Sequence, residues 1–228
     1  MKKFFLIGSS SFLLKNIEKL LGKKYYEIVS ISRKVNKNKN KNGIKCYSTD
    51  YSIQSLKKIF QKEIRSNKCK PIFIFGNVIT QSELFINTDE KYLNKLLKVN
   101  IELPLKIIRI VLKEFVQKKP IFFNISSIRT YPGVGYSLYG ASKIFMENIF
   151  KNLALEYGGL GCIFKTIRLG IVSGGLGSKV SEKVLKDCEK RSSIRGFVDI
   201  NEILNTILFE IKKKSSNGKV IHCDNGYF

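Results

Sequence analysis

The stretch KKFFLIGSSSFLLKNIEKLLGKKYYEIVSIS, residues 2–32, decides the fold. A short apolar run at 2–8 predicts a buried strand, an amphipathic segment at 12–22 predicts a helix, and a second apolar run at 26–32 predicts another strand. Two neighbouring strands connected through a helix run parallel, and the crossover between them is right-handed. The first 32 residues therefore predict a βαβ unit.

The same alternation continues along the rest of the chain. Further strands are expected at 43–50, 70–76, 119–127, 162–172 and 218–224, with helices at 52–67, about 90–117, 137–158 and about 201–213. The segment before the last helix is expected to be a glycine-rich loop. We find no linker and no repeat, so residues 1–228 predict a single α/β domain with a doubly wound parallel sheet in three layers.

The composition narrows the class of protein. Hydrophobic residues make up 43% and charged residues 26% of the chain, as in an ordinary globular domain. No apolar run reaches the roughly 18 residues of a membrane span, and no small-residue cleavage site follows the apolar start, so we expect a cytoplasmic protein without a membrane partner. One histidine and five scattered cysteines, with no Cys-x-x-Cys pair, favour reduced thiols and no metal site.

The net charge of +23 would suit a nucleic-acid-binding protein. Lysine far outnumbers arginine, however, and lysine, asparagine and isoleucine are abundant throughout, which indicates a coding bias. We therefore expect no nucleic-acid partner, although a basic protein favours anionic ligands such as a dinucleotide.

The strand pattern also predicts where a ligand binds. In open parallel sheets, ligands bind beyond the carboxyl ends of the strands. The segments expected at that edge are Gly8–Ser11, Ser32–Arg33, Asp50, Gly76–Asn77, Ser126–Ser127 and Gly170–Gly175.

One of these segments, NISSIRTYPGVGYSLYGASK at residues 124–143, contains a candidate catalytic set. One Tyr-x-x-x-Lys pair is no more than chance supplies in so lysine-rich a chain, so the pair has to be judged by its surroundings. Tyr139 and Lys143 lie four residues apart, which places both on one face of a helix. A phenol titrates near pH ~10, and a nearby ammonium favours the phenolate. We therefore expect Lys143 to lower the pKa of Tyr139.

In this order and spacing, several segments together resemble the short-chain dehydrogenase/reductase family over nearly the whole chain. The matching segments are NISS with YGASK, the KVN that ends at Asn100, and the closing NGKVIHCDNGYF. The resemblance implies a Rossmann-like fold and NAD(P)-dependent oxidoreduction. It further implies that Tyr139 transfers a proton to or from the substrate oxygen and that Lys143 binds the nicotinamide ribose. A serine holds the carbonyl oxygen; alignment on NISS favours Ser127, while the spacing to the tyrosine also admits Ser126.

The resemblance assigns Asn100 to a proton relay, through a water held by its backbone carbonyl. Pro104 lies four residues further on and has no N–H, so it cannot bond that carbonyl in an α-helix. The alternative is an ordinary proline kink.

The first turn departs from the family pattern, which has three glycines. The pattern is Gly-x-x-x-Gly-x-Gly or, in long-form relatives, Gly-x-x-Gly-x-x-Gly. Here the sequence is GSSSFLL, and only Gly8 remains: the first form puts Phe12 and Leu14, and the second puts Ser11 and Leu14, at glycine positions. Glycine at these positions lets the backbone approach the pyrophosphate and lets the helix pack on the strand. Leu14 should therefore push the helix outward or require a smaller neighbour. The resemblance implies cofactor contacts from Gly8, Ser10, Ser11, Phe12, Leu13, Arg33, Asp50, Gly76, Asn77, Tyr139, Lys143 and Ile171.

The end of the second strand bears on cofactor choice. Ser32, Arg33 and Lys34 offer a hydroxyl and two cations where an acidic residue would favour NAD. NADP(H) is therefore favoured over NAD(H).

The substrate is a small carbonyl or alcohol, and residues 173–198 are expected to form a lid over it. RLGIVSGG, residues 168–175, resembles nucleotide-sugar-modifying long forms, which suggests a sugar-derived substrate in polysaccharide biosynthesis. The family also suggests a homodimer or homotetramer, formed through the helices of Asn100 and Tyr139. Because of the altered first turn, a non-catalytic Rossmann-like nucleotide-binding or regulatory protein is the alternative.

Overall fold

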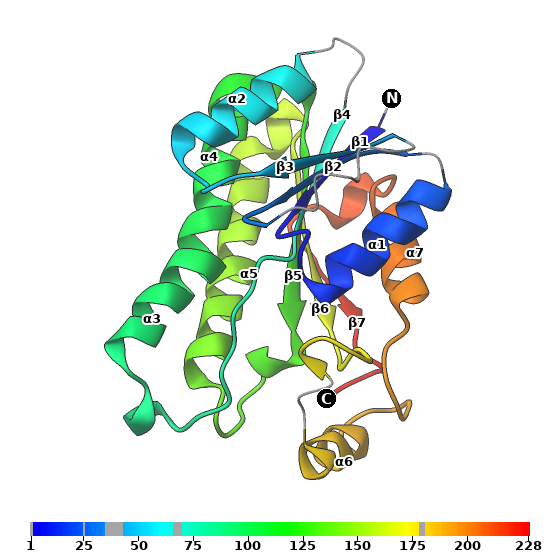
Figure 1. Cartoon of the computed structure of the whole chain (residues 1–228). Coiled ribbons are helices and arrows are strands. Elements are labelled where there is room, and N and C mark those ends of the chain that lie inside the picture. Colours follow the sequence, from blue (N-terminus) through cyan, green and yellow to red (C-terminus); the bar gives the residue numbers. More distant parts are fainter. Residues whose placement is uncertain (1, 25, 35–42, 66–69, 178–180) are drawn as a thin grey trace.

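The computed structural model describes residues 2–24, 26–34, 43–65, 70–177 and 181–228. Its seven-stranded sheet has the order β3-β2-β1-β4-β5-β6-β7, and every neighbouring pair is parallel (Figure 1). The strands are β1 (Lys2–Ile7), β2 (Glu27–Ser32), β3 (Ile44–Ser48), β4 (Lys70–Phe75), β5 (Ile121–Ser127), β6 (Ile163–Leu169) and β7 (Val220–Cys223). The prediction of a doubly wound parallel sheet is confirmed, and each expected strand is present.

The helices cover both faces of the sheet (Figure 1). They are α1 (Phe12–Lys23), α2 (Ile53–Ile64), α3 (Glu90–Leu97), α4 (Leu103–Phe115), α5 (Ser137–Tyr157), α6 (Glu182–Lys190) and α7 (Ile200–Glu210). Buried side chains of α2, α4 and α5 form one core against the sheet, and those of α1 and α7 form the other. Two cores on one sheet give the three layers expected from the sequence.

A row of stacked phenylalanines stiffens the first core. Phe5, Phe73, Phe122 and Phe164 come from four adjacent strands and are fully buried. Their ring centroids are 4.7, 5.3 and 4.9 Å apart along the row. Burial of one such side chain contributes roughly 1.5–3 kcal/mol to stability, so the row fixes the central strands whose ends form the site.

The helix expected over 90–117 is interrupted. A π-helical turn at Lys98–Glu102 separates α3 from α4, and Leu103 N donates to the carbonyl of Lys98 instead of that of Val99. Because Pro104 has no N–H to offer either, the Val99 carbonyl accepts a hydrogen bond from Asn77 Nδ2. The proline thus ties this helix to the loop that follows β4.

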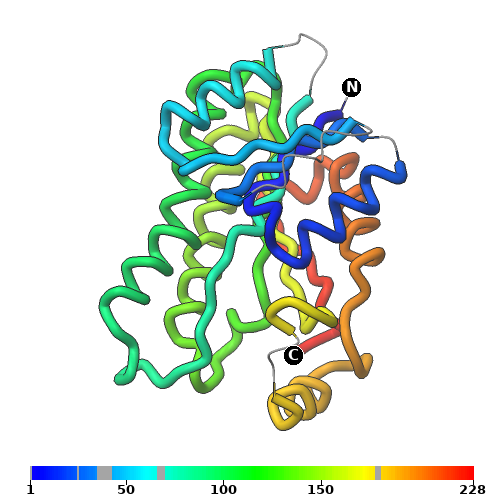
Figure 2. The backbone as a smooth tube through the Cα atoms, viewed as in Figure 1, coloured from blue at the N-terminus to red at the C-terminus, as the bar shows by residue number. Residues whose placement is uncertain are grey.

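The segment expected to be a glycine-rich loop contains a helix, so that expectation was incomplete. Ser181 caps α6, with its hydroxyl accepting from Val184 N at 3.4 Å, and an exposed Lys186–Glu182 ion pair lies on its surface. Within α6, Cys188 is the one buried side chain, so the helix lacks the apolar stripe that reveals a core helix in a sequence. The trace in Figure 2 shows α6 beyond the sheet, near the C-terminus.

Candidate active site

Tyr139 and Lys143 lie one turn apart on the first part of α5, and both side chains are buried. The helix can start so close to the end of β5 because residue 140 is glycine: a Cβ there would lie 2.3 Å from the Arg129 carbonyl oxygen. Lys143 Nζ donates to the Ile125 carbonyl at 2.8 Å and lies 5.6 Å from the Tyr139 ring centroid. The helix face therefore presents both groups to the carboxyl end of β5.

The two serines at the end of β5 have different partners. Ser127 is hydrogen-bonded to the Tyr139 phenol, and its Oγ accepts from Arg129 N at 3.2 Å. Ser126 donates to Glu147 Oε1 at 2.6 Å. The geometry thus places Ser127 with the tyrosine, whereas Ser126 bonds a buried carboxylate one turn beyond Lys143.

The expectation that Lys143 lowers the pKa of Tyr139 was wrong for this site. Burial raises the pKa of Tyr139 to about 12, although the hydrogen bond from Ser127 and the charge of Arg129 oppose that rise. Burial also lowers the pKa of Lys143 to about 8, and the nearby Glu147 carboxylate opposes that change. Desolvation outweighs the expected attraction because both groups are enclosed and the ammonium points to the Ile125 carbonyl.

Tyr139 and Lys143 line a cavity of about 470 Å³. Of the residues expected to contact cofactor or substrate, the cavity is lined by Ser11, Phe12, Leu13, Gly76, Ser127, Tyr139, Lys143 and Ile171. Gly8, Ser10, Arg33, Asp50, Asn77 and Asn100 do not line it. The cavity therefore runs from the first turn of α1 to the tyrosine.

The Asn100 side chain forms hydrogen bonds to two segments next to the site. Its Oδ1 accepts from Ile79 N at 2.9 Å, and its Nδ2 donates to the Ile79 carbonyl at 3.0 Å and to Ser142 Oγ at 3.2 Å. Ser142 in turn donates to the Tyr139 carbonyl at 2.7 Å. The side chain therefore couples the loop after β4 to the helix that carries the tyrosine. The predicted relay through the Asn100 carbonyl stays a prediction.

The first turn keeps its shape with one glycine. Gly8 has φ +80°, and a Cβ on it would lie 2.7 Å from the backbone of Asn77. The Ser11 side chain caps α1 by accepting from Leu14 N at 3.4 Å. The helix N-terminus, which favours phosphate, thus stays at the cavity.

Leu14, in place of a family glycine, has the smaller neighbour that the sequence demanded. It is fully buried, and its Cγ lies 2.5 Å from where a Cβ of Gly76 would be. The side chain therefore fills the space that a side chain at position 76 would need, and it stays out of the groove.

Phe12, in place of a second family glycine, is also matched by glycine. Its ring would lie 2.3 Å from a Cβ on Gly174, and its own Cβ would lie 2.6 Å from a Cβ on Gly175. Both glycines belong to the loop after β6, which therefore packs directly on the first turn. Phe12 forms part of the cavity wall and leaves the cavity open.

The residues present fit a dinucleotide. The cavity reaches from a capped helix N-terminus to a buried tyrosine and lysine, with the Thr80 hydroxyl on its wall. That hydroxyl is buried and has no hydrogen-bond partner among the described residues, so it is free to bond a ligand. Within the same residues, no group of three His, Cys, Asp or Glu side chains could hold a metal ion.

The residues expected to contact the adenosine part of the cofactor lie at the surface. Arg33 and Asp50 are exposed, and Asp50 Oδ1 accepts from Ser52 N at 2.9 Å, a bond that lowers the pKa of Asp50. Tyr51, the residue after Asp50, was not predicted to take part in the site. It has φ +62°, and its hydroxyl donates at 3.2 Å to the Ile31 carbonyl. That carbonyl also accepts from the first-turn amides of Gly8 and Ser9, so Tyr51 supports the turn; nothing in the sequence signals this.

Glu147 and Arg168 were missed as well. Arg168 Nη2 donates to Glu147 Oε2 at 2.7 Å and its Nε to Oε1 at 3.1 Å, while its guanidinium lies 5.1 Å from the Tyr131 ring centroid. Together with the bond from Ser126, this links α5, β5 and β6 beside Lys143. The spacing Tyr139, Lys143, Glu147 on one helix face was the signal that could have identified the carboxylate.

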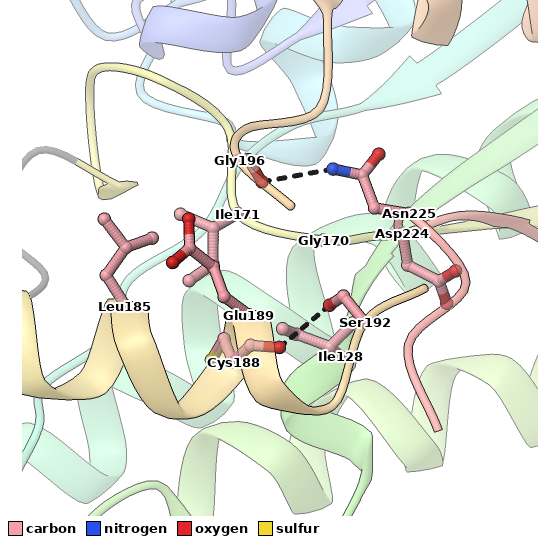
Figure 3. A pocket seen from close by; sticks show the side chains of 10 residues that line it. All are labelled: Ile128, Gly170, Ile171, Leu185, Cys188, Glu189, Ser192, Gly196, Asp224 and Asn225. Atoms are coloured by element: carbon pink, nitrogen blue, oxygen red, sulfur yellow. Dashed lines mark hydrogen bonds between the residues drawn. The ribbon is translucent and has the colours of Figure 1, made fainter. Parts of the chain in front are cut away.

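The segment expected to form a lid is hydrogen-bonded to the C-terminal turn. A small cavity beside the site lies between α6, the start of the loop after β6 and the C-terminal turn (Figure 3). Asn225 Nδ2 donates to the Gly196 carbonyl at 3.1 Å, and Ile194 N donates to the Asn225 carbonyl at 3.1 Å. Residues 178–180 of the expected lid lie outside the described residues.

Comparisons with known proteins agree with this geometry. A family model described as enoyl-(acyl carrier protein) reductase matches residues 72–228, which is more than half of the chain. Carbonyl reductase family member 4 of Xenopus laevis is 25% identical, with 97% of this chain and 95% of that protein aligned. The 3-oxoacyl-[acyl-carrier-protein] reductase FabG of Buchnera aphidicola subsp. Schizaphis graminum (strain Sg) is 24% identical, with 100% and 97% aligned.

Solved structures share the fold. The structure of ElxO with NADP bound superposes with a TM-score of 0.86 at 19% identity, covering 99% of this chain and 98% of that one. That of 4-hydroxyisoleucine dehydrogenase complexed with NADH gives 0.84 at 18% identity, with the same coverage. In the described part of the chain, the helices are too short or too polar to cross a membrane. The chain belongs to the short-chain dehydrogenase/reductase family of NAD(P)-dependent oxidoreductases.

Proposed function

We propose that this protein is an NADP(H)-dependent oxidoreductase that interconverts a carbonyl and a secondary alcohol. The observation that carries the proposal is the buried Tyr139–Lys143 pair, with Ser127 bonded to the phenol, at one end of a cavity whose other end is the first turn of α1. A nicotinamide cofactor supplies or accepts the hydride when it is bound.

Each side chain has a role that follows from its surroundings. With a pKa of about 12, Tyr139 keeps its proton at neutral pH and donates it to the substrate oxygen during reduction. Ser127 orients that oxygen through the same hydroxyl that bonds the phenol. Lys143 donates one of its three hydrogens to Ile125, which leaves two for a ribose hydroxyl.

Replacement of Tyr139 by Phe tests the proposal. We expect carbonyl-dependent oxidation of NADPH to fall at least about 100-fold, because the proton donor is lost. NADPH binding, measured by isothermal titration, should be retained. Undiminished turnover by the variant would refute the assignment.

The preference for NADP(H) rests on Arg33. Its backbone is held at the end of β2 by Ser48 Oγ, which donates to the Arg33 carbonyl at 2.9 Å, and its exposed guanidinium suits a 2′-phosphate. We expect Arg33→Gln to weaken NADPH binding roughly 10-fold and to leave NADH binding unchanged. Equal loss for both cofactors would contradict the preference.

The alternative is a non-catalytic nucleotide-binding or regulatory protein. The replacement of two first-turn glycines by Phe12 and Leu14 favours it. Isothermal titration with NADPH and NADH, followed by a panel of carbonyl compounds, separates the two proposals. Binding without turnover of any compound would favour the alternative.

Further parts of the proposal concern substrate, assembly and location. The glycine-rich loop after β6 supports a small, sugar-derived substrate, as in polysaccharide biosynthesis. On α5, Ile144 and Phe145 are exposed by 49% and 42%, which supports pairing of two subunits into a homodimer or homotetramer in the cytoplasm. Light scattering tests the assembly, and cell fractionation tests the location.

A further inference from the structure

From the charges around the 470 Å³ cavity we infer that the substrate carries an oxyanion, a carboxylate or a phosphate, and that the Arg129 guanidinium binds it. This inference rests on the proposed function, since it concerns the substrate end of the same site. It adds a specificity-determining residue and a class of substrate.

Arg129 is held at the end of the cavity next to Tyr139. It follows the end of β5 by two residues, its N–H donates to Ser127 Oγ at 3.2 Å, and its carbonyl packs against Gly140. The guanidinium lies 4.1 Å from the Tyr136 ring centroid. Stacking on a ring fixes the plane of a guanidinium and leaves its N–H groups free to donate in that plane.

Within the part of the chain that the structure describes, no carboxylate is paired with the Arg129 guanidinium. Glu147, the carboxylate beside Lys143, is bonded to Arg168 and Ser126. The acidic residues of α6 form no ion pair with it either, although its charge acts on the Cys188 thiol of that helix. Arg129 therefore lies between the tyrosine and the lid with its hydrogen-bond donors available.

Among the described residues, those that line the cavity include cations but no carboxylate. Its charged lining residues are Arg129 and Lys143, and the rest are apolar, hydroxyl-bearing or glycine. Lys143 is assigned to the ribose, and the first turn of α1, at the opposite end, is assigned to the pyrophosphate. This leaves Arg129 as the partner of a negative group on the substrate.

The size of the substrate follows from the same geometry. Arg129 is close enough to Tyr139 for its charge to oppose the rise in that phenol's pKa. The anion and the reacting carbonyl therefore belong to one small molecule, such as an oxo acid or a phosphorylated hydroxyketone. A sugar-derived substrate would accordingly be a sugar acid or a sugar phosphate.

Matched substrate pairs test this inference in the full-length protein with NADPH. Acetoacetate is compared with methyl acetoacetate, and dihydroxyacetone phosphate with dihydroxyacetone, so that the two arms distinguish carboxylate from phosphate. For one of the two substrate pairs, we expect the wild-type kcat/KM to be at least about 10-fold higher for the anionic compound than for its neutral partner. Arg129→Gln should lower kcat/KM for that anion by roughly 10- to 100-fold and leave the neutral partner within about threefold. Arg129→Lys should restore part of the loss.

Arg109→Gln is the control, because it removes one positive charge from an exposed position on α4, away from the cavity. It should leave the ratio of anion to neutral substrate unchanged. Turnover of the neutral compounds without preference for either anion, or an equal ratio in wild type and Arg129→Gln, overturns the inference and leaves the oxidoreductase intact. If no compound is turned over, the proposed function fails. Titration of acetoacetate and dihydroxyacetone phosphate into the NADPH-loaded protein then decides: binding of either that Arg129→Gln loses supports the inference, and no such binding overturns it.

Discussion

Two buried lysines, at opposite ends of the sheet, are treated differently by this fold. Lys165, near the start of β6, is fully buried and forms an ion pair with Glu210 at 2.8 Å. It also donates to Ser216 Oγ at 2.7 Å and to the carbonyls of Glu210 and Lys213. Lys143, at the carboxyl end of β5, is 6% exposed, and within the described residues its ammonium has one acceptor, the Ile125 carbonyl.

The difference separates a structural lysine from a ligand-binding one. An ammonium has three donors, and leaving them unused in a buried site is costly unless a ligand takes them. Lys165 has a full set of acceptors and a counter-charge, so it serves the fold. Lys143 has one acceptor and no ion-pair partner among the described residues, so the fold bears a cost there that a bound ribose hydroxyl would offset.

Replacement of Lys143 by Met should produce the largest effect. We expect kcat/KM to fall about 10²–10⁴-fold, because the group that positions the cofactor ribose beside Tyr139 is lost. The free energy of unfolding should fall by less than about 1 kcal/mol or rise, since an incompletely bonded buried cation is removed. Steady-state kinetics and urea unfolding measure the two quantities. A large loss of stability with unchanged activity would reverse the roles assigned to the two lysines.

Replacement of Lys165 by Met should act on stability. It leaves the Glu210 carboxylate buried without its counter-charge, which we expect to lower the free energy of unfolding by about 3–5 kcal/mol. Urea unfolding measures the loss, and Lys151→Met, at an exposed position of α5, is the matched control. A change below about 1 kcal/mol would show that the Lys165–Glu210 ion pair contributes little to stability.

The pH dependence of stability should show the free-energy cost of burying the charged Lys143 ammonium. Its folded pKa, about 8, lies below the ordinary lysine value of 10.5, so between these values the unfolded chain binds more protons. Stability should therefore rise with pH from about 8 to 10.5, by about 3 kcal/mol relative to Lys143→Met. Urea titrations of both proteins across this range give the difference, and a flat difference would contradict the lowered pKa.

The sequence was sufficient for the parts of this comparison that depend on local pattern. The alternation of short apolar runs with longer amphipathic segments located all seven strands, and the spacing of Tyr139 and Lys143 placed them on one helix face. The packing of Leu14 against Gly76 and of Phe12 against Gly174 could not be predicted from the sequence, because each contact joins segments far apart in the chain. The sequence also could not show that desolvation outweighs the attraction between Lys143 and a Tyr139 phenolate, because the balance depends on how deeply the two side chains are buried.

Glu147 offers the smallest change and the sharpest one. It lies as close along the helix to Lys143 as an ion-pair partner could, but its oxygens bond Arg168 and Ser126, so it acts on Lys143 through its charge alone. Since that charge raises the pKa of Lys143, Glu147→Gln should lower it further. The activity that requires the ammonium would then be lost at a lower pH, so the alkaline limb of the kcat/KM profile should shift to lower pH.

The broken bonds to Arg168 should also lower the free energy of unfolding by roughly 1–3 kcal/mol, which urea unfolding measures separately. Glu156→Gln, exposed on the same helix, is the control and should leave the limb in place. If Glu147→Gln loses stability while its alkaline limb stays at the wild-type pH, Glu147 belongs with Glu210 as a purely structural carboxylate, and the contrast between the two lysines loses its electrostatic part.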